Sequence, residues 1–348
     1  MSTSTRHNDV APPKRDAIPA AANFARGRTV ADFLKPEWAV LPVLVVVIVI
    51  GAVLNPTFLS YNNIYGILQQ TSELAVLTMG LTLVLITGKF DLSLESVFGL
   101  APMVAAFCFL QVAGGSLGLM NSPVVALLAV FVVGALIGAF NGVLVVCLKF
   151  NAFIATLATL ILLRGVSLGL THGATLSGLP SVLTIPGQAS VAQLPLSFLI
   201  ALLVLIALTL FLSRHRVGRM LYAVGGNPQA ARVAGIRVER VIMGVFIIGG
   251  VLAALAGLLQ AGRIASIPSS LGQNLIFNAF AAAVLGGVSL NGGRGTVAGA
   301  CGGVLLLVLI QNVLVLSNVP AYWINATTGA IILIALLISK VSGADKGA

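Results

Sequence analysis

The sequence predicts an all-α membrane protein of about ten transmembrane helices with both termini on the cytoplasmic side. Three observations support this fold class: the composition, the spacing of apolar runs and the distribution of Lys and Arg. Of the 348 residues, 58% are hydrophobic and 8% are charged, and the mean hydropathy is +1.08. A soluble domain is roughly 25% charged. Because a soluble fold lacks the interior to hide this much apolar surface, a lipid bilayer must serve as its solvent.

The apolar runs have the length that a bilayer requires, which is roughly 20 residues per helix. They predict spans at about 38–54, 64–87, 93–112, 123–147, 153–170, 195–213, 240–262, 275–290, 296–317 and 322–339. The run at 275–290 is short and ends in glycines, so it also fits a half-helix or a re-entrant element.

The positive charges agree with this arrangement, since cytoplasmic connections carry the excess of Lys and Arg. With the N-terminus inside, every Lys and Arg except Arg164 and Arg263 falls on a cytoplasmic tail or connection. The outside connections hold none, and these are 55–63, 113–122, 171–194 and 318–321. The net charge of +10 therefore reflects topology, and no basic stripe with interleaved aromatics indicates nucleic-acid binding.

The chain divides into one transmembrane domain, 38–340, and two cytoplasmic tails. Residues 1–37 are rich in Ala, Pro and Arg and lack the apolar core of a secretory signal, which predicts a disordered tail. Residues 341–348 form the second tail. The glycine-rich hairpins around Asp91 and Arg294 resemble each other, which suggests an internal repeat.

Glycine and cysteine give further expectations about packing. The 38 glycines include two series spaced every four residues, from Gly134 to Gly142 and from Gly295 to Gly303. Each series lines one helix face and favours close packing within the chain over a dimer seam. The cysteines lie in apolar runs without CxxC spacing, which predicts buried, inert thiols at Cys108, Cys147 and Cys301.

One cytoplasmic connection has the signals of a short helix at about 227–235. Asn227 suits the N-cap, Pro228 the first helical position and Gly235 the C-terminal stop. Its small side chains fit a groove on another protein, namely Ala230, Ala231 and Ala234. An ordinary surface helix held by anionic lipid is the alternative.

Few residues in the sequence suggest chemistry. There is no catalytic triad, pair of active-site carboxylates or metal cluster, and no GxxxxGK[ST] phosphate loop. The sequence therefore predicts no enzyme and no metal site. The energy for any transport must come from another chain or from an ion gradient.

Four motifs stand in order along the chain: Thr87-Gly-Lys-Phe-Asp-Leu-Ser93 with Glu95-Ser-Val97; Asn141-Gly142 with Phe153–Thr159 and Leu163–Gly165; Gly225–Ile236; and Val284–Gly295. From about Phe58 to Leu337 the sequence resembles the permease subunits of ribose, xylose and related sugar ABC importers. Gly225–Ile236 matches the Gly-Gly-Asn-x-x-Ala-Ala-x-x-x-Gly-Ile coupling helix of that family position by position.

The resemblance implies a permease in the inner membrane, surrounded by lipid, that imports a sugar of the pentose or hexose class. Its implied partners are an ABC ATPase, which binds the ATP so that this chain needs no cofactor, an extracytoplasmic sugar-binding protein and a second permease subunit in a homodimer. The residues implied in ATPase coupling are Gly226, Asn227, Pro228, Ala230, Ala231, Arg232 and Gly235.

Two departures from the family pattern bear on the site. Lys89 and Glu95 replace family glycines, which suggests a Lys–Glu contact, and Ile276 stands where the family usually has Glu. Only the architecture and the transport role therefore carry over, and not a particular sugar.

Polar residues within the spans are candidates for a translocation pathway: Asn141, Thr156, Thr159, Arg164 and Asn278. Interhelical hydrogen bonding explains the neutral ones equally well. A charge at the bilayer centre costs roughly 2.5–3.5 kcal/mol, so Arg164 is expected to face the pathway or to pair with a carboxylate such as Glu73. Asp91 is expected to cap the third span.

Two other function classes fit the sequence less well. An ion-coupled secondary transporter would use Glu73, Asp91 or Arg164 in a relay, but a cluster of facing carboxylates at the midplane is absent. A structural or receptor protein would not depend on a soluble ATPase.

Overall fold

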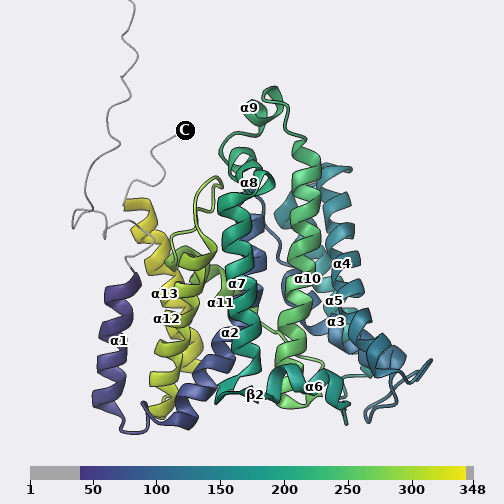
Figure 1. The fold of residues 1–348 in the computed structure, drawn as a ribbon, viewed down its shortest axis with the longest axis vertical. Helices are drawn as coiled ribbons and strands as arrows, with labels where there is room; N and C mark the ends of the chain where they lie inside the picture. The colour runs from purple at the N-terminus through teal and green to yellow at the C-terminus, as the bar shows by residue number, and fades with distance from the viewer. Residues whose placement is uncertain (1–39, 342–348) are drawn as a thin grey trace, which may run out of the picture.

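The computed structural model describes residues 40–341, and most of them are helical (Figure 1). The helices are α1 (Val40–Leu54), α2 (Tyr61–Ile86), α3 (Leu94–Phe109), α4 (Pro123–Val146), α5 (Ala152–Thr171), α6 (Ser181–Gln188), α7 (Leu196–Arg214), α8 (Arg216–Gly226), α9 (Pro228–Val233), α10 (Val238–Ile264), α11 (Leu275–Leu285), α12 (Val297–Leu316) and α13 (Ala321–Val341). The predicted tail 1–37 and all but the first residue of 341–348 lie outside the described residues.

The all-α membrane class is confirmed. Each predicted apolar span overlaps one of these helices, and six of the described helices are long and apolar enough to cross a bilayer: α2, α4, α5, α7, α10 and α12. The apolar parts of α1, α3, α11 and α13 are shorter. The number of spans, the side of the termini and the internal repeat remain predictions.

The two ends of the helix bundle differ. At one end α8 and α9 extend beyond the long helices, and at the other end α6 lies beside the hairpin that contains β2 (Figure 1). The strands are β1 (Leu176–Ser177), β2 (Ser190–Val191), β3 (Leu194–Pro195) and β4 (Ser266–Ile267). β1 pairs antiparallel with β4, with Leu176 opposite Ile267, and β2 pairs with β3. The predicted connection 171–194 therefore contains α6, β1 and β2, and β3 begins at its last residue.

The core is built around α2 and α10. Residues 72–86 of α2 are all buried, and α10 packs against α2, α3 and α4. The first glycine series lies on α4 against α10: a Cβ on Gly134 would lie 2.6 Å from the Gly250 oxygen, and one on Gly138 would lie 2.3 Å from the Phe246 oxygen. These glycines therefore pack within the chain, as the sequence predicts.

Two stretches of non-helical backbone enter the bundle. One is 87–93, between α2 and α3, and the other is 268–274, between β4 and α11. The second packs closely on α3, where a Cβ on Gly99 would lie 2.4 Å from the Leu271 oxygen. α11 has 11 residues, about 16 Å of helix, and stops before the glycines at 286 and 287. The predicted segment 275–290 is therefore only partly helical.

The three cysteines are free, as predicted. Cys108 and Cys301 are half-buried, but Cys147 is exposed, so the prediction of burial is wrong for this residue. Cys147 follows the last residue of α4, whose outward face is apolar and open. A polarizable thiol at such an apolar surface behaves as a small hydrophobe.

We predict that Gly250→Ala destabilises the fold and Gly244→Ala, on the same helix, does not. A Cβ at 250 would lie 2.2 Å from the Gly134 oxygen, whereas nothing lies within 4 Å of a Cβ at 244. Overpacking costs about 1–3 kcal/mol, and the open position gains up to about 1 kcal/mol of helix propensity. Denaturant unfolding in detergent micelles measures both, and equal effects would contradict the packing of α4 on α10.

Candidate transport site and coupling surface

A buried chain of hydrogen bonds joins α5, α4 and the start of α3. The Thr159 hydroxyl donates to Asn141 Oδ1 (2.8 Å), the Asn141 amide donates to Ser93 Oγ (2.7 Å), and the Ser93 hydroxyl donates to Asp91 Oδ1 (2.5 Å). All four side chains are at most 3% exposed. The donors all run in one direction, and the Asp91 carboxylate at the end accepts the last hydrogen bond. Asp91 also accepts the Ser93 N–H just before α3, close to the capping role expected of it.

The connection 87–93 runs along α5 inside the bundle. The Leu92 N–H donates to Thr156 Oγ1 (3.1 Å), and one turn further along α5 the Ser96 hydroxyl donates to the Leu160 carbonyl (2.8 Å). α3 therefore starts one to two turns inside the length of α5. Thr156, like Asn141 and Thr159, braces helices in this structure instead of lining an open surface.

An ion pair lies near the middle of α5. Arg164 is the thirteenth of its 20 residues, and Nη2 lies 2.9 Å from Glu95 Oε1. Glu95 Oε2 accepts the Ile276 N–H (3.4 Å) in the first turn of α11, whose N-cap residue provides no side-chain cap. The two departures from the family pattern are therefore in contact. Glu95 stands where the family has glycine, Ile276 stands where the family has Glu, and the Glu95 carboxylate accepts the Ile276 N–H.

Arg164 pairs with a carboxylate as expected, but the named partner is wrong, because Glu73 binds another arginine. Arg263 at the end of α10 donates from Nε to Glu73 Oε1 (2.6 Å) and from Nη2 to Oε2 (3.1 Å). This bidentate ion pair connects α2 to α10. The Lys–Glu contact suggested for Lys89 is also not formed, since the Glu95 carboxylate faces Arg164 and α11.

Three glycine-containing segments that are distant in the sequence meet at the C-terminal end of α2. The Gly293 N–H donates to the Ile86 carbonyl (2.8 Å). A Cβ on Gly225 would lie 1.8 Å from that same oxygen and 2.5 Å from the Gly293 nitrogen, and one on Gly292 would lie 2.7 Å from the Gly88 Cα. We call this contact of residues 86–88, 225–226 and 292–293 the glycine junction. Only glycine permits backbones to approach so closely.

The short predicted helix is α9, and its termini are fixed as expected. The Asn227 side chain accepts the N–H groups of residues 229 and 230, and Gly235 has φ +81°. Ala231 is 4% exposed and packs within the chain, so its methyl group is not available to a partner. Val233 is 91% exposed, and Arg232 pairs with Glu239 (2.6 Å) on α10. The most exposed apolar side chain of this surface is therefore Val233. The sequence pattern indicated the alanines of this segment and not Val233.

The remaining predicted residues lie between the end of α8 and the turn after α9, or on α11. Gly226, Asn227, Pro228, Ala230 and Gly235 are exposed along with Arg232. Asn278 is half-buried in the first turn of α11, near the Glu95 contact but not in the hydrogen-bonded chain. Among residues 40–341, no group of three His, Cys, Asp or Glu side chains is placed to hold a metal ion.

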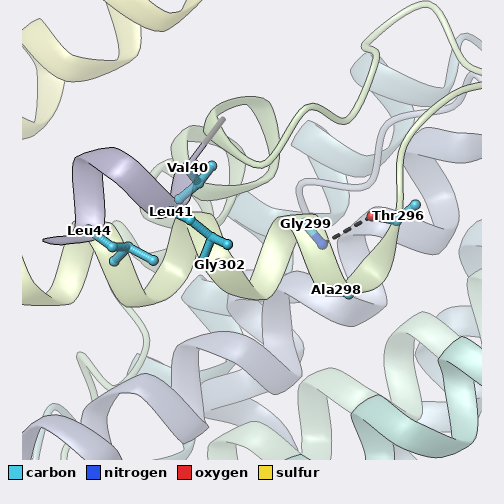
Figure 2. Close-up of a pocket in the computed structure, with 7 residues that line it drawn as sticks. All are labelled: Val40, Leu41, Leu44, Thr296, Ala298, Gly299 and Gly302. Atoms are coloured by element: carbon cyan, nitrogen blue, oxygen red, sulfur yellow. Dashed lines mark hydrogen bonds between the residues drawn. The ribbon is translucent and has the colours of Figure 1, made fainter. Parts of the chain in front are cut away.

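Two of the hollows formed by residues 40–341 differ in size and lining. One, of about 590 Å³, lies between the 87–93 connection and the start of α5 and is lined by Gly88, Lys89, Phe90, Lys149, Phe150, Asn151, Ala152 and Phe153. The other, of about 150 Å³, lies between α1 and α12 (Figure 2). Its polar side chain, Thr296, accepts the Gly299 N–H as the N-cap of α12, so this hollow is an apolar packing gap.

Comparison with known proteins identifies the family. The family model described as the permease component of branched-chain amino acid transport systems matches residues 63–336. The chain belongs to this permease family. The ribose import permease protein of Escherichia coli (strain K12) is 36% identical over 301 residues, 85% of this chain and 91% of that protein.

Two further relatives cover similar lengths of the permease. The autoinducer 2 import system permease protein of Enterobacter sp. (strain 638) is 41% identical over 286 residues, 82% of this chain and 81% of that protein. The ribose import permease protein of Haemophilus influenzae (strain ATCC 51907) is 34% identical over 330 residues, 93% of this chain and 98% of that protein. No solved structure matches the permease.

We predict that Glu95→Ala destabilises the permease by about 3 kcal/mol, because it leaves Arg164 unpaired in the bundle. Glu239→Ala should destabilise the permease far less, since the Arg232–Glu239 pair is more than half exposed. Unfolding in detergent micelles measures both, and Glu95→Leu with Arg164→Met should recover most of the loss. Equal effects of the two single changes would show that the buried pair is not a brace.

Proposed function

We propose that this protein is the membrane-spanning subunit of an ATP-driven ABC importer in the bacterial inner membrane. It translocates a sugar of the pentose or hexose class that an extracytoplasmic binding protein delivers, while a separate subunit hydrolyses ATP. Family membership and the two ribose import permeases support the sugar class. The observation that carries the coupling role is the glycine junction, which joins three of the four motifs and leads directly into α9.

The proposed coupling surface is the exposed side of α9 and its flanks. Val233 is an exposed apolar side chain, and the exposed basic residues that flank it in the sequence are Arg219, Arg232, Arg237 and Arg240. An apolar side chain surrounded by polar ones is typical of the centre of a protein interface. The exposed residues Gly226 to Ala230 and Gly235 complete the surface that the ATPase contacts.

The proposed pathway follows the open face of α5. The apolar residues Ile161 and Leu162 on this helix are more than half exposed. The Arg164 side chain beside them is also partly exposed, at 27%. A charged group at this depth is almost always in contact with water or with protein, not lipid. We therefore place a second copy of the chain across this face, with Arg164 and Asn278 at the path and the Asn141–Thr159 hydrogen bond behind it.

The proposed topology has ten spans with both termini in the cytoplasm. α2 and α10 are both long, and each leads through non-helical backbone into a short helix, α3 or α11. This succession supports an internal repeat that pairs 87–93 with 268–274, a different pairing from that of the Asp91 and Arg294 hairpins.

The test is reconstitution of the permease with its ATPase and binding protein in proteoliposomes. We expect uptake of radiolabelled ribose to require ATP and the binding protein. Uptake driven by a proton or sodium gradient without ATP would instead identify a secondary transporter. Ribose that is not taken up under either condition, while another pentose or hexose is, would narrow the substrate class.

We predict that Val233→Asp weakens association of the ATPase at least about tenfold, since a charge would enter an apolar contact. The side chain is 91% exposed, so the stability of the isolated permease should change by less than about 0.5 kcal/mol. Val191→Asp is the matched control: Val191 is 51% exposed on β2, at the other end of the bundle. Co-purification and titration measure the affinity, and unchanged binding by Val233→Asp would exclude α9 as the docking helix.

A further inference from the structure

Three phenylalanines from separate elements meet beside the larger hollow. The Phe90 ring, in the 87–93 connection, stacks on Phe280 of α11 with centroids 5.8 Å apart and planes at 27°. Its other neighbour is Phe153 of α5, at 6.3 Å and 81°. These are the offset-stacked and edge-to-face arrangements that aromatic rings favour.

The aromatic cluster lies between the ion pair and the hollow. Along α11, Phe280 follows Ile276 by one turn, and Ile276 contacts Glu95. Along α5, Phe153 precedes Arg164 by three turns and lines the hollow together with Phe90. A solute that moves from the level of Arg164 toward the hollow along these two helices therefore meets the Phe90 ring.

The backbone that carries Phe90 is joined to the coupling segment. Phe90 comes two residues after Gly88, and the Ile86 carbonyl is held by the Gly293 N–H and covered by Gly225. Gly225 is the penultimate residue of α8, and α9 begins three residues later. Because no side chain separates these backbones, a displacement of α8 and α9 moves residues 86–88 directly.

We propose that Phe90 is the inner gate of the transport path and that the glycine junction links it to α9. The ring closes the path against Phe153 and Phe280, and movement of α9 by the ATPase withdraws it. When the gate opens, the ring faces offer an apolar surface to the C–H side of a neutral sugar, and the Glu95–Arg164 pair above it carries no net charge. This inference rests on the proposed transport function and names the residue that controls exit.

The test measures access to a cysteine behind the gate. In a permease whose Cys108, Cys147 and Cys301 are replaced by alanine, Leu92→Cys places a thiol at a buried position next to Thr156. A membrane-impermeant maleimide is added on the cytoplasmic side of vesicles that contain the full complex. We expect slow labelling with Phe90 present and labelling about tenfold faster with Phe90→Ala, since two ring contacts are lost.

Phe150→Ala is the matched control, because Phe150 lines the same hollow and has no ring contact to the other three in the described residues. It should leave labelling unchanged. Phe280→Ala removes the same stack from the α11 side and should act like Phe90→Ala, so the proposal is testable even if one variant does not fold. Equal labelling in the parent and in the folded Phe90→Ala or Phe280→Ala variants would overturn it, as would an equal increase with Phe150→Ala.

A second arm tests the link to α9. ATP should change the labelling rate in the parent complex and in Gly244→Ala, where a Cβ meets nothing within 4 Å and which lies outside the coupling surface. It should not do so in Gly225→Ala, where the Cβ collides with Ile86. A labelling rate that is the same with and without ATP in the parent complex would overturn the proposed link between α9 and the gate. Because labelling needs no substrate, a failure of ATP-dependent uptake for every pentose and hexose tested would reject the proposed function without deciding this inference.

Discussion

Non-helical backbone inside an apolar bundle must find its hydrogen-bond partners within the protein, and the centre of this permease depends on that constraint. In residues 87–93 side chains accept two of the backbone N–H groups: Thr156 accepts that of Leu92, and Asp91 accepts that of Ser93. Residues 268–274 form turns, in which the N–H groups of Leu271 and Leu275 donate to the carbonyls three residues earlier. The carboxylate of Glu95 then accepts an N–H group at the start of α11. Without these partners the chain would have to remain helical, and the bundle would have no irregular segment near its middle.

Close approach of backbones is the second requirement, and glycine meets it at each contact. Gly99 admits the Leu271 carbonyl to the surface of α3, and Gly257 of α10 admits the Phe98 carbonyl. These contacts hold the irregular segments against rigid helices, where their polar groups stay away from lipid. The two arginines within the bundle also have their partners inside the protein, because each is paired with a glutamate from a different helix. The pairs fix α3 to α5 and α2 to α10 and leave the interior without net charge at these points.

Hydropathy was sufficient to predict where the long helices lie, because a bilayer imposes one length and one composition on them. Local capping signals were sufficient for α9, where Asn227 and Gly235 act as expected. The choice of polar partners was not predictable in this way. Whether Arg164 meets Glu73 or Glu95 depends on the rotation of α5 and on where α3 begins, and the start of α3 is set by the irregular backbone before it. The same limit applies to Ala231 and Val233, since a six-residue helix has too few turns for its periodicity to show which side is covered.

The short length of α9 bears on how it can transmit force. A helix of six residues has no stability of its own in water. This one is held by the Asn227 cap, by burial of Ala231 and by the Arg232–Glu239 pair, and so it is attached to α8 on one side and to α10 on the other. Because these attachments are close and do not include a flexible linker, a partner that displaces α9 displaces both helices. α10 leads to the ion pair with Glu73 in the core, and α8 ends at the glycine junction. In the proposed coupling, α9 therefore acts on the interior through two packed helices, α8 and α10, and the connection through Gly225 of α8 is the shorter one.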